Sequence, residues 1–300
     1  MNKQPLVTVI CICYNHQKYV IETIQSVLHQ TYSPIEIIVI DDKSSDRSVE
    51  LIQDFLADYP AIQLIQNTEN LGNTKTFNKA VGYAHGEYLI DLACDDILLP
   101  HCVETQVATF LQNKTSDIGI VFGNSEQIDE SGVYLRDYFP TDGNRSVCNK
   151  ALFSMDLEFI LQGGLCMNSA SAMMHRGIFE QLGKYDERLA FEDLDYWIRV
   201  LEKYRIVFID DILTQKRDVK NSMGAHFFQH NDFANALDLS MLRVLKQTID
   251  RHRTEAPILR AIRKRIHNGI ENSWKGRKYN IVWAYLWQKL RIHYWLLFAK

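Results

Sequence analysis

The sequence predicts an α/β fold in which a mostly parallel sheet is flanked by helices, followed by a helical C-terminal extension. Three observations carry this prediction. Short apolar runs alternate with segments of helical period through the first half of the chain. The runs are apolar almost without interruption, as in strands that are covered on both faces. From about residue 225 onward the pattern is helical throughout, so we expect an α/β domain at 1–224 and the extension at 225–300.

The individual elements follow from the same patterns. The first strand is expected at LVTVICIC, and the segment YVIETIQSVLHQ then places one apolar stripe on a helix: Val20, Ile24, Val27 and Leu28. Further strands are expected at 35–41, 62–67, 87–93, 117–123, 169–175 and 205–210. Helices are expected at 45–58, in TKTFNKAVGYAH, after Pro100, and in GIFEQLG and FEDLDYWIRVLEKY. The stretch from residue 123 to about residue 155 is irregular and polar, and we expect it to form loops beside a site.

Composition limits the class of protein. The chain has 300 residues and 46% hydrophobic content, enough for one sizeable core. No stretch approaches the roughly 18 to 20 apolar residues that span a bilayer, and the N-terminal segment lacks the pattern of a secretory signal, so a cytoplasmic protein is expected. The six cysteines show no C-x-x-C spacing and are expected to be reduced and mostly buried.

Polar residues follow four of the predicted strands. If the strands are parallel, their carboxyl ends meet at one edge of the sheet, where ligands bind in open α/β folds. The residues there are Tyr14-Asn15, Asp41-Asp42, Asn67 to Asn73 and Cys94-Asp95-Asp96. Neither a G-x-G-x-x-G turn nor a P-loop is present to bind phosphates. Carboxylates that hold Mn²⁺ or Mg²⁺ could replace them, and Asp95 with Asp96 fits that role, although an Asp pair after a strand also forms turns or helix caps.

Five sequence segments, which follow one another in this order along the chain, support a more specific interpretation. They are VTVICICYN, SVLHQTYSPIEIIVIDDKSSDRS, NLGNTKTFNKAV, GEYLIDLACDDILLP and KYDERLAFEDLDYWIRV. Together they closely resemble the family 2 glycosyltransferases, which have the GT-A fold and invert the configuration of the transferred sugar. The resemblance spans about residues 5–222.

The resemblance implies roles for residues at the predicted edge. Tyr14 would stack on the nucleotide base and Asp42 would accept its ring N–H, whereas a surface turn and a helix cap are the structural alternatives. Asp95 would coordinate the metal that bridges the donor diphosphate. Asp96 would add a supporting hydrogen bond. The sequence departs from the common D-x-D pattern, because Ala93 or Cys94 occupies its first acidic position.

The block FEDLDYWIRV carries the acidic motif of the family. The resemblance implies that Asp193, which follows Glu192, is the general base. Asp195 lies about 200° away around a helix and would face elsewhere. Trp197 lies on the side of Asp193 and could wall an acceptor site; the alternative is that Trp197 belongs to the core.

A later segment, QKRDVKNSMG, resembles the loop that brings a basic side chain to the leaving diphosphate in this family. Arg217 and Lys216 are the candidates, with His226 as an extra metal ligand, and a solvated basic loop is the alternative. The Q-x-x-R-W signature of processive synthases is absent from the sequence, which favours the addition of one or a few sugars.

Taken together, these features predict an inverting, metal-dependent transfer from a nucleotide-diphosphate sugar to a hydroxyl of a glycan or lipid-linked acceptor in surface glycan or glycoconjugate synthesis. One alternative is a nucleotidyltransferase, but CYNHQKY lacks the Gly-rich, Arg-containing loop that such an enzyme carries after its first strand. The other alternative is a non-catalytic protein of the same fold that binds a nucleotide sugar.

The C-terminal extension differs in charge from the rest of the chain. Residues 251–300 hold twelve of the 33 Lys and Arg residues but only two of the 37 Asp and Glu residues. One helix has an isoleucine stripe (Ile258, Ile262, Ile266, Ile270), and the next has an aromatic one: Trp283, Leu286, Trp287, Leu290, Tyr294 and Leu297. Basic residues beside interfacial aromatics are typical of a helix on an anionic membrane surface. A packing or dimerisation arm is the alternative, and no nucleic-acid partner is expected because the remaining chain is acidic.

Overall fold

The computed structural model describes residues 4–112, 117–163, 168–219 and 232–299. The chain divides into two compact units, and each unit is assembled from segments that are distant in sequence. The first, here called the sheet unit, comprises Met1–Ser154, Met167–Tyr185 and Lys203–Val219. The second, the helical unit, comprises Met155–Cys166, Asp186–Glu202 and Lys220–Lys300. The helical unit thus includes two segments that precede the C-terminal helices, and the predicted domain boundary at 224/225 stays a prediction.

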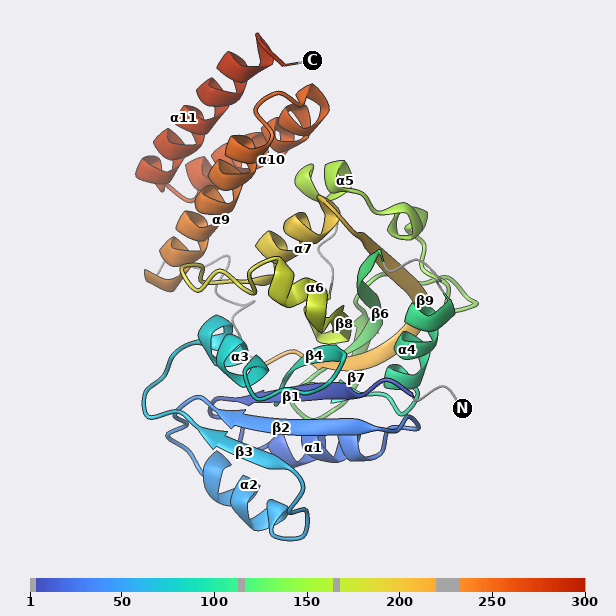
Figure 1. Cartoon of the computed structure of the whole chain (residues 1–300). Coiled ribbons are helices and arrows are strands. Elements are labelled where there is room, and N and C mark those ends of the chain that lie inside the picture. Colours follow the sequence, from blue (N-terminus) through green and yellow to red (C-terminus); the bar gives the residue numbers. More distant parts are fainter. Residues whose placement is uncertain (1–3, 113–116, 164–167, 220–231, 300) are drawn as a thin grey trace. The chain divides into compact units, whose positions relative to one another are not determined.

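Within the described residues, nine strands form one mixed sheet (Figure 1). Eight of them lie in the order β3-β2-β1-β4-β8-β6-β9-β5, and β7 pairs with β6. Their bounds are β1 Val7–Cys13, β2 Ile35–Asp41, β3 Gln63–Gln66, β4 Tyr88–Ala93, β5 Ile97–Leu98, β6 Ile118–Ile128, β7 Tyr134–Asp137, β8 Ala172–His175 and β9 Arg205–Arg217. The predicted α/β class is confirmed, with a larger antiparallel share than expected.

Strand β1 lies at the centre of the parallel part of the sheet. It pairs in parallel with β2 from Val7↔Ile35 to Cys13↔Asp41. On its other side it pairs in parallel with β4, up to Ile12↔Ala93. All seven residues of β1 are buried, which explains its uninterrupted apolar sequence. These registers bring the carboxyl ends of β1, β2 and β4 to one edge, as the sequence predicted.

The other half of the sheet departs from the prediction. Strand β8 runs antiparallel to both of its neighbours, β4 and β6. Strands β6 and β9 pair in parallel as far as Ile128↔Arg217, well beyond the expected ends at residues 123 and 210. The extensions contain many polar residues, so they lack the apolar run that marks a strand in sequence. The predicted loop region after residue 123 therefore begins as a strand.

Helices cover both faces of the sheet. The bounds in the sheet unit are α1 Val20–Leu28, α2 Ser48–Leu56, α3 Asn73–Val81, α4 Cys102–Gln112 and α6 Arg176–Gln181, with 3-10 turns at Lys150–Ser154 and Ser169–Ser171. Figure 1 shows α1 and α3 on opposite sides of β1 and β2. The face of α1 that packs inward carries Val20, Ile24 and Val27, as predicted.

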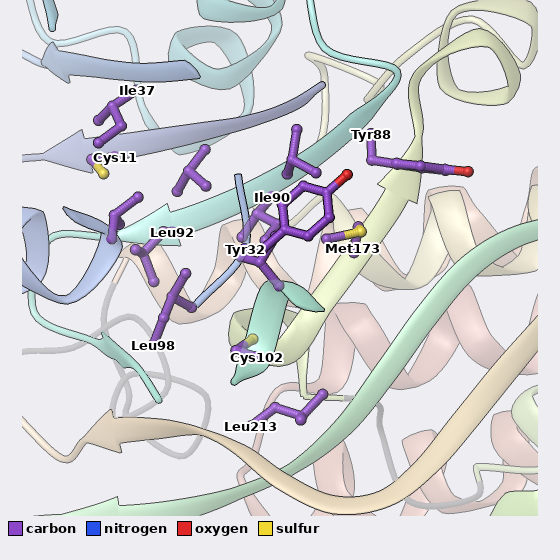
Figure 2. Close-up of a cluster of buried hydrophobic side chains, with 14 of the residues drawn as sticks. Cys11, Tyr32, Ile37, Tyr88, Ile90, Leu92, Leu98, Cys102, Met173 and Leu213 are labelled. Carbon is purple, nitrogen blue, oxygen red and sulfur yellow. The ribbon is translucent and has the colours of Figure 1, made fainter. Parts of the chain in front are cut away.

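One hydrophobic core lies between the sheet and the helices on the α1 and α4 side (Figure 2). Members labelled in Figure 2 come from β1, β2, β4, β5, β8, β9 and α4 and from the loop before β2, so residues distant in sequence share one interior: Cys11, Tyr32, Ile37, Tyr88, Ile90, Leu92, Leu98, Cys102, Met173 and Leu213. Tyr88 stacks on Phe110 with ring centroids 4.4 Å apart. Four of the described cysteines are free and buried, which confirms their expected role as small apolar side chains; Cys148 is free and exposed.

The helical unit contains α5 Leu157–Leu161, α7 Asp193–Leu201, α9 Asp232–Arg251, α10 Ala256–Lys275 and α11 Tyr279–Leu296. The predicted isoleucine stripe of α10 is buried at Ile258, Ile262 and Ile266. Helices α10 and α11 approach closely at Gly269, where an added Cβ would lie 2.6 Å from the ring of Tyr285. None of the helices in the described part of the chain is long and apolar enough to cross a bilayer.

A histidine between two carboxylates holds part of the helical unit together. His252 Nε2 lies 2.9 Å from Glu202 Oε1, and Nδ1 lies 2.9 Å from Glu255 Oε1. Both ring nitrogens therefore donate only when the imidazole is charged. The hydrogen bond to Glu202, supported by Glu255, raises the pKa of His252. The charged imidazole therefore contributes to the free energy of unfolding. This contribution is fully present below the pKa of about 6.5 that histidine has in the unfolded chain, and it is lost as pH rises through the higher pKa of His252 in the folded protein.

We predict that His252→Gln lowers the unfolding temperature most at about pH 5.5 to 6. The difference in unfolding temperature between the variant and the unmodified protein should shrink as pH rises through the raised pKa of His252. The measurement is thermal unfolding at a series of pH values. His267→Gln is the matched control, because the contact of His267 with Glu271 is exposed and contributes little. A difference that is independent of pH would contradict the assignment.

Candidate active site

The loops that follow β1 and β2 are fixed to each other by hydrogen bonds. The backbone N–H of Asn15 donates to Ser44 Oγ over 2.9 Å, and the backbone N–H of Ser45 donates to Asn15 Oδ1 over 2.7 Å. Asn15 adopts a positive φ of 59°, a conformation that Asn tolerates better than most residues. This turn leaves the neighbouring Tyr14 46% exposed at the end of β1. An exposed aromatic ring at this edge can stack on a flat ligand.

Asp42 is buried and holds the loop that follows β3. Its carboxylate accepts hydrogen bonds from Asn67 Nδ2 and from the backbone N–H groups of Leu71 and Gly72, each over 2.8 Å. Asp42 therefore does not cap α2, which was the structural alternative. One of its oxygens, Oδ2, accepts only the Gly72 N–H among the described contacts, so a carboxylate lone pair remains that a ligand N–H could use.

Two carboxyl groups occupy the turn between β4 and β5. The Asp95 side chain is 13% exposed, and its Oδ2 lies 3.8 Å from Nε2 of His16. The Asp96 side chain is buried, and its Oδ1 accepts the backbone N–H of Arg217 over 2.9 Å. Burial, together with the charge of Asp95, raises the pKa of Asp96 to about 7. A buried acid next to a second carboxylate is a site where a cation is favourable.

Buried polar atoms at this edge also lack partners. Within the described part of the chain, Nδ1 of His16 and Oδ1 of Asp41 are buried and make no hydrogen bond. Such groups are rare in folded proteins and carry a free-energy cost, so they mark positions where water or a ligand completes the hydrogen bonding. Both belong to loops or strand ends that border the Asp95 turn or the Asp42 loop.

The geometry fits a metal that binds together with its substrate. No group of three or more His, Cys, Asp or Glu side chains among the described residues forms a complete metal cluster. Mg²⁺ and Mn²⁺, however, commonly bind through one or two carboxylates and complete their coordination with substrate phosphates. Asp95 and Asp96 supply that number of carboxylates. The residues present therefore fit a divalent ion that arrives with a diphosphate.

Arg217 is buried and connects several segments of this region through the hydrogen bonds of its side chain. Its Nε donates to the carbonyl oxygen of Asp95 over 3.1 Å, and Nη1 donates to the carbonyl oxygen of Asp129 over 3.2 Å. Nη2 donates to Glu22 Oε2 over 2.7 Å, and the guanidinium lies 4.6 Å from the ring centre of Tyr19. The sequence placed Arg217 against a leaving diphosphate, but its side chain is only 2% exposed and its contacts lie within the protein. Its basic neighbour Lys216 is partly exposed and acts electrostatically on Asp96.

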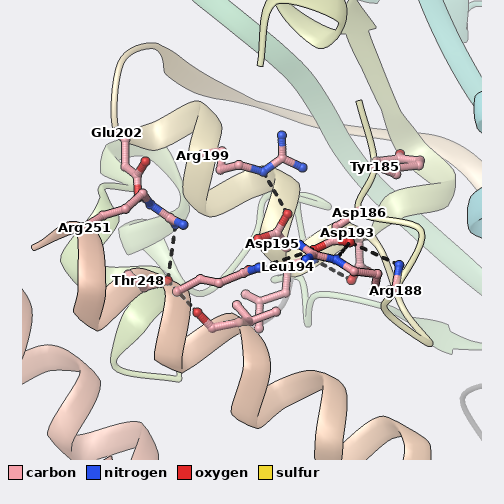
Figure 3. Close-up of polar contacts among 12 residues, drawn as sticks. Tyr185, Asp186, Arg188, Asp193, Leu194, Asp195, Arg199, Glu202, Thr248 and Arg251 are labelled. Atoms are coloured by element: carbon pink, nitrogen blue, oxygen red, sulfur yellow. Dashed lines mark hydrogen bonds and ion pairs between the residues drawn. The ribbon is translucent and has the colours of Figure 1, made fainter. Parts of the chain in front are cut away.

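The two aspartates of the FEDLD block, Asp193 and Asp195, make different contacts in α7 (Figure 3). Asp195 is buried and pairs with Arg199 Nε over 2.8 Å, one helical turn away. Asp193 is the first residue of α7 and is partly exposed, with Oδ1 accepting the backbone N–H of Leu194 over 2.7 Å. The preceding Glu192 is buried. Asp195 is thus committed to an internal ion pair, and Asp193 is the more accessible carboxylate.

Trp197 and His226 require separate comment. Trp197 is 3% exposed, and its neighbours Ile198 and Val200 are also buried, so its ring belongs to the interior of the helical unit. Its burial favours the core alternative over a wall of an acceptor site. His226 lies outside the described residues. Asp193 belongs to the helical unit, whereas Tyr14, Asp42 and Asp95 belong to the sheet unit.

Comparison with known proteins identifies the family. The model of "Glycosyl transferase family 2" matches residues 8–183, more than half of the chain. The chain belongs to glycosyltransferase family 2. The matched segment contains the ends of β1, β2, β3 and β4 and the turn between β4 and β5, whereas Asp193 and Arg217 lie beyond it.

Curated relatives carry the same activity in their names. The chain is 33% identical over 218 residues to an uncharacterized glycosyltransferase of Methanocaldococcus jannaschii, covering 71% of each chain. It is 31% identical over 246 residues to an uncharacterized glycosyltransferase of Rickettsia felis, covering 81% of this chain but 39% of that one. This family 2 protein is therefore a glycosyltransferase. It spans less than half the length of some of its curated relatives.

Solved structures support the GT-A fold. A mannosyltransferase from Pyrobaculum calidifontis in complex with GDP-Man and Mn²⁺ matches with a TM-score of 0.65 at 15% identity, covering 96% of this chain and 74% of that one. TarS residues 1–349 of S. aureus in complex with UDP-GlcNAc matches with a TM-score of 0.64 at 16% identity, covering 89% and 74%. At these identities the likeness concerns the fold alone.

The family resemblance did not single out His16, Glu22 or Asn67 as individual contributors to the site. His16 lies two residues after Tyr14, and a histidine in that short loop was the available signal. Glu22 occupies the first turn of α1, where an acid commonly serves the helix dipole, so its contact with Arg217 could not be inferred. Asn67 was included in a range at the strand end but had no assigned role.

We predict that Arg217→Lys destabilises the protein by about 1–3 kcal/mol, because lysine cannot reproduce the three directions of the guanidinium and leaves partly buried carbonyl groups unpaired. Glu22→Gln is the matched control on the same contact and should cost about 0–1 kcal/mol, since Glu22 is 56% exposed. The measurement is urea unfolding of both variants. A change below about 1 kcal/mol for Arg217→Lys would favour a ligand-binding role instead.

Proposed function

We propose that this family 2 glycosyltransferase performs an inverting, metal-dependent transfer of a sugar from a nucleoside-diphosphate donor to an acceptor hydroxyl. The observation that carries the proposal is the edge formed by the ends of β1, β2 and β4. An exposed ring at Tyr14, a buried carboxylate at Asp42 and an acidic pair at Asp95 and Asp96 gather at that edge of the sheet.

The donor nucleotide would bind between the loops after β1 and β2. Tyr14 would stack on the base, and the remaining lone pair of Asp42 would accept a ring N–H. Asp42 is held by three donors from the 67–72 loop, so it would not need to reorganise on binding. The two structural neighbours with bound GDP-Man and UDP-GlcNAc support a nucleotide sugar as the ligand class.

The diphosphate would lie against the turn between β4 and β5. Asp95 and Asp96 would hold Mn²⁺ or Mg²⁺ there, and the bound ion would supply Lewis-acid masking of the charge on the leaving diphosphate. The partly exposed Lys216 would add positive charge on the same side. Arg217 would act indirectly, because its hydrogen bonds to the Asp95 carbonyl and from its own backbone to Asp96 fix the turn.

Asp193 would serve as the general base. It would take the proton of the acceptor hydroxyl as that oxygen forms its bond to the anomeric carbon, while the bond to the diphosphate oxygen breaks. Attack from the face opposite the leaving group inverts the anomeric configuration. Asp195 is a poor candidate, because its carboxylate is already paired with Arg199 in a buried contact.

The acceptor is proposed to be a glycan or a lipid-linked hydroxyl in the synthesis of a surface glycan or glycoconjugate. The basic segment 251–300 would contact an anionic membrane surface near such an acceptor. A location at the inner face of the membrane stays a prediction.

We expect Asp193→Asn to reduce transfer by roughly 10² to 10⁴, the usual contribution of a general base, while donor binding is retained. Asparagine keeps the size of the side chain but removes the basic carboxylate. The measurement is nucleoside diphosphate release and product formation across a panel of nucleotide sugars and acceptors at saturating Mn²⁺.

Asp195→Asn is the matched control on the same helix. It should lower the unfolding temperature, because it breaks a buried pair with Arg199, but the correctly folded fraction should keep most of the transfer activity. A tenfold or smaller loss in Asp193→Asn, or an equal loss in both variants, would remove Asp193 from the role of base.

A further inference from the structure

Helix α11 presents a large apolar face that the described part of the chain leaves exposed. The exposed members of this face, here called the α11 stripe, are 52% to 72% exposed: Tyr279, Trp283, Trp287, Leu290, Tyr294, Leu297 and Phe298. Trp274, at the end of α10, is 62% exposed and lies 5.6 Å from the ring of Tyr279. Single exposed apolar residues are common on protein surfaces, but a continuous aromatic stripe of this length marks an interaction surface.

The exposed residues of the stripe all lie on one side of the helix. Successive residues turn by about 100°, which places the stripe within an arc of about 100°. The opposite side packs inside the helical unit through Ile281, Val282, Tyr285, Gln288 and Ile292. Helix α11 is therefore apolar on two opposite faces, of which the protein covers one. The sequence predicted an apolar face here, and the structure shows that this face is turned to solvent.

The charges around the stripe have one sign. Helix α11 contains Lys289, Arg291 and His293 and no acidic residue. Lys289 is exposed on another side of the helix, about 80° from the edge of the stripe, and Arg291 is paired with Asp250. On α10, Arg263 and Lys264 are also exposed. Exposed tryptophan and tyrosine in a segment rich in lysine and arginine suit the boundary between lipid headgroups and acyl chains, where a ring has an apolar body and a polar tip.

We propose that the α11 stripe lies in the headgroup region of an anionic lipid bilayer, with Trp283 and Trp287 inserted and the excess positive charge of residues 251–300 close to the lipid phosphates. The inference deepens the proposed contact of residues 251–300 with an anionic surface and rests on it. It names the face that is buried in lipid and makes insertion of aromatic rings, rather than charge alone, the main source of affinity.

A second copy of this chain is the competing occupant, and the charge pattern disfavours it. Residues 251–300 hold twelve Lys and Arg residues and only two acidic residues, so two copies packed through α11 would bring together two segments of the same charge. No carboxylate on α11 would compensate these charges. A bilayer with anionic headgroups supplies the compensation that a second α11 stripe lacks.

The test uses point substitutions in the full chain, because α10 and α11 pack against each other and α11 is tied to α9 through the pair of Arg291 and Asp250. The variant is Trp283→Ser with Trp287→Ser. The matched control is Leu111→Ser with Val133→Ser, which removes two apolar side chains of similar exposure, 59% and 60%, from the sheet unit. Unfolding temperature and helical circular dichroism of all forms verify that the fold is intact.

Binding is measured by co-sedimentation with vesicles of phosphatidylcholine containing about 30% phosphatidylglycerol, and with pure phosphatidylcholine, at about 50 mM salt and without donor. The unmodified protein and the control should bind the anionic vesicles, and the tryptophan variant should bind at least about tenfold more weakly. Raised salt should weaken the binding of the unmodified protein only in part.

Three outcomes would overturn the proposal. They are absence of binding by the unmodified protein, equal binding by the tryptophan variant, and a dimer in solution that the tryptophan variant abolishes while vesicles are not bound. Nucleoside diphosphate release, measured separately without vesicles, tests the proposed transfer. A protein that releases nucleotide but ignores vesicles contradicts the lipid surface alone, and the converse contradicts the transfer alone.

Discussion

The parallel pairing of β1 with β2 on one side and β4 on the other is the constraint on which the candidate site depends. Because the registers run without interruption to Cys13↔Asp41 and Ile12↔Ala93, three loops begin at one edge of the sheet. The full burial of β1 stabilises this arrangement, since seven residues are removed from water together. That alignment brings Tyr14, Asp42 and Asp95, whose ligand-binding roles the family resemblance implies, to one edge of the sheet.

Hydrogen bonds fix the positions of the loops that begin at this edge of the sheet. Asp42 fixes the loop after β3, Asn15 joins the loops after β1 and β2, and Arg217 joins the turn between β4 and β5 to α1 and to the end of β6. The burial of Arg217 changes its interpretation from a ligand contact to a support for one. Asp195 is committed to a buried pair with Arg199, and Asp193 is the more exposed of the two aspartates.

The sequence predicted the parallel strands well, because a strand buried on both faces leaves an unbroken apolar run, and the family motifs located the polar residues after them. It could not predict the antiparallel direction of β8, since apolar residues carry no direction, or the polar extensions of β6 and β9. The contacts of Arg217 depend on residues up to 195 positions away, which no local pattern reveals. For α11 the sequence showed apolar residues on several sides, and only the packing showed which side stays exposed.

The central claim is that this edge of the sheet binds a nucleoside diphosphate together with a divalent ion through Asp95. The direct measurement is thermal unfolding with UDP, GDP, CDP and dTDP, each with and without Mn²⁺, on the unmodified protein and on Asp95→Asn. A ligand at 100 times its dissociation constant stabilises the folded state by about 2.7 kcal/mol. We predict stabilisation by at least one diphosphate that requires Mn²⁺ and is lost in Asp95→Asn. Stabilisation that is equal without metal, or unchanged in Asp95→Asn, would contradict it.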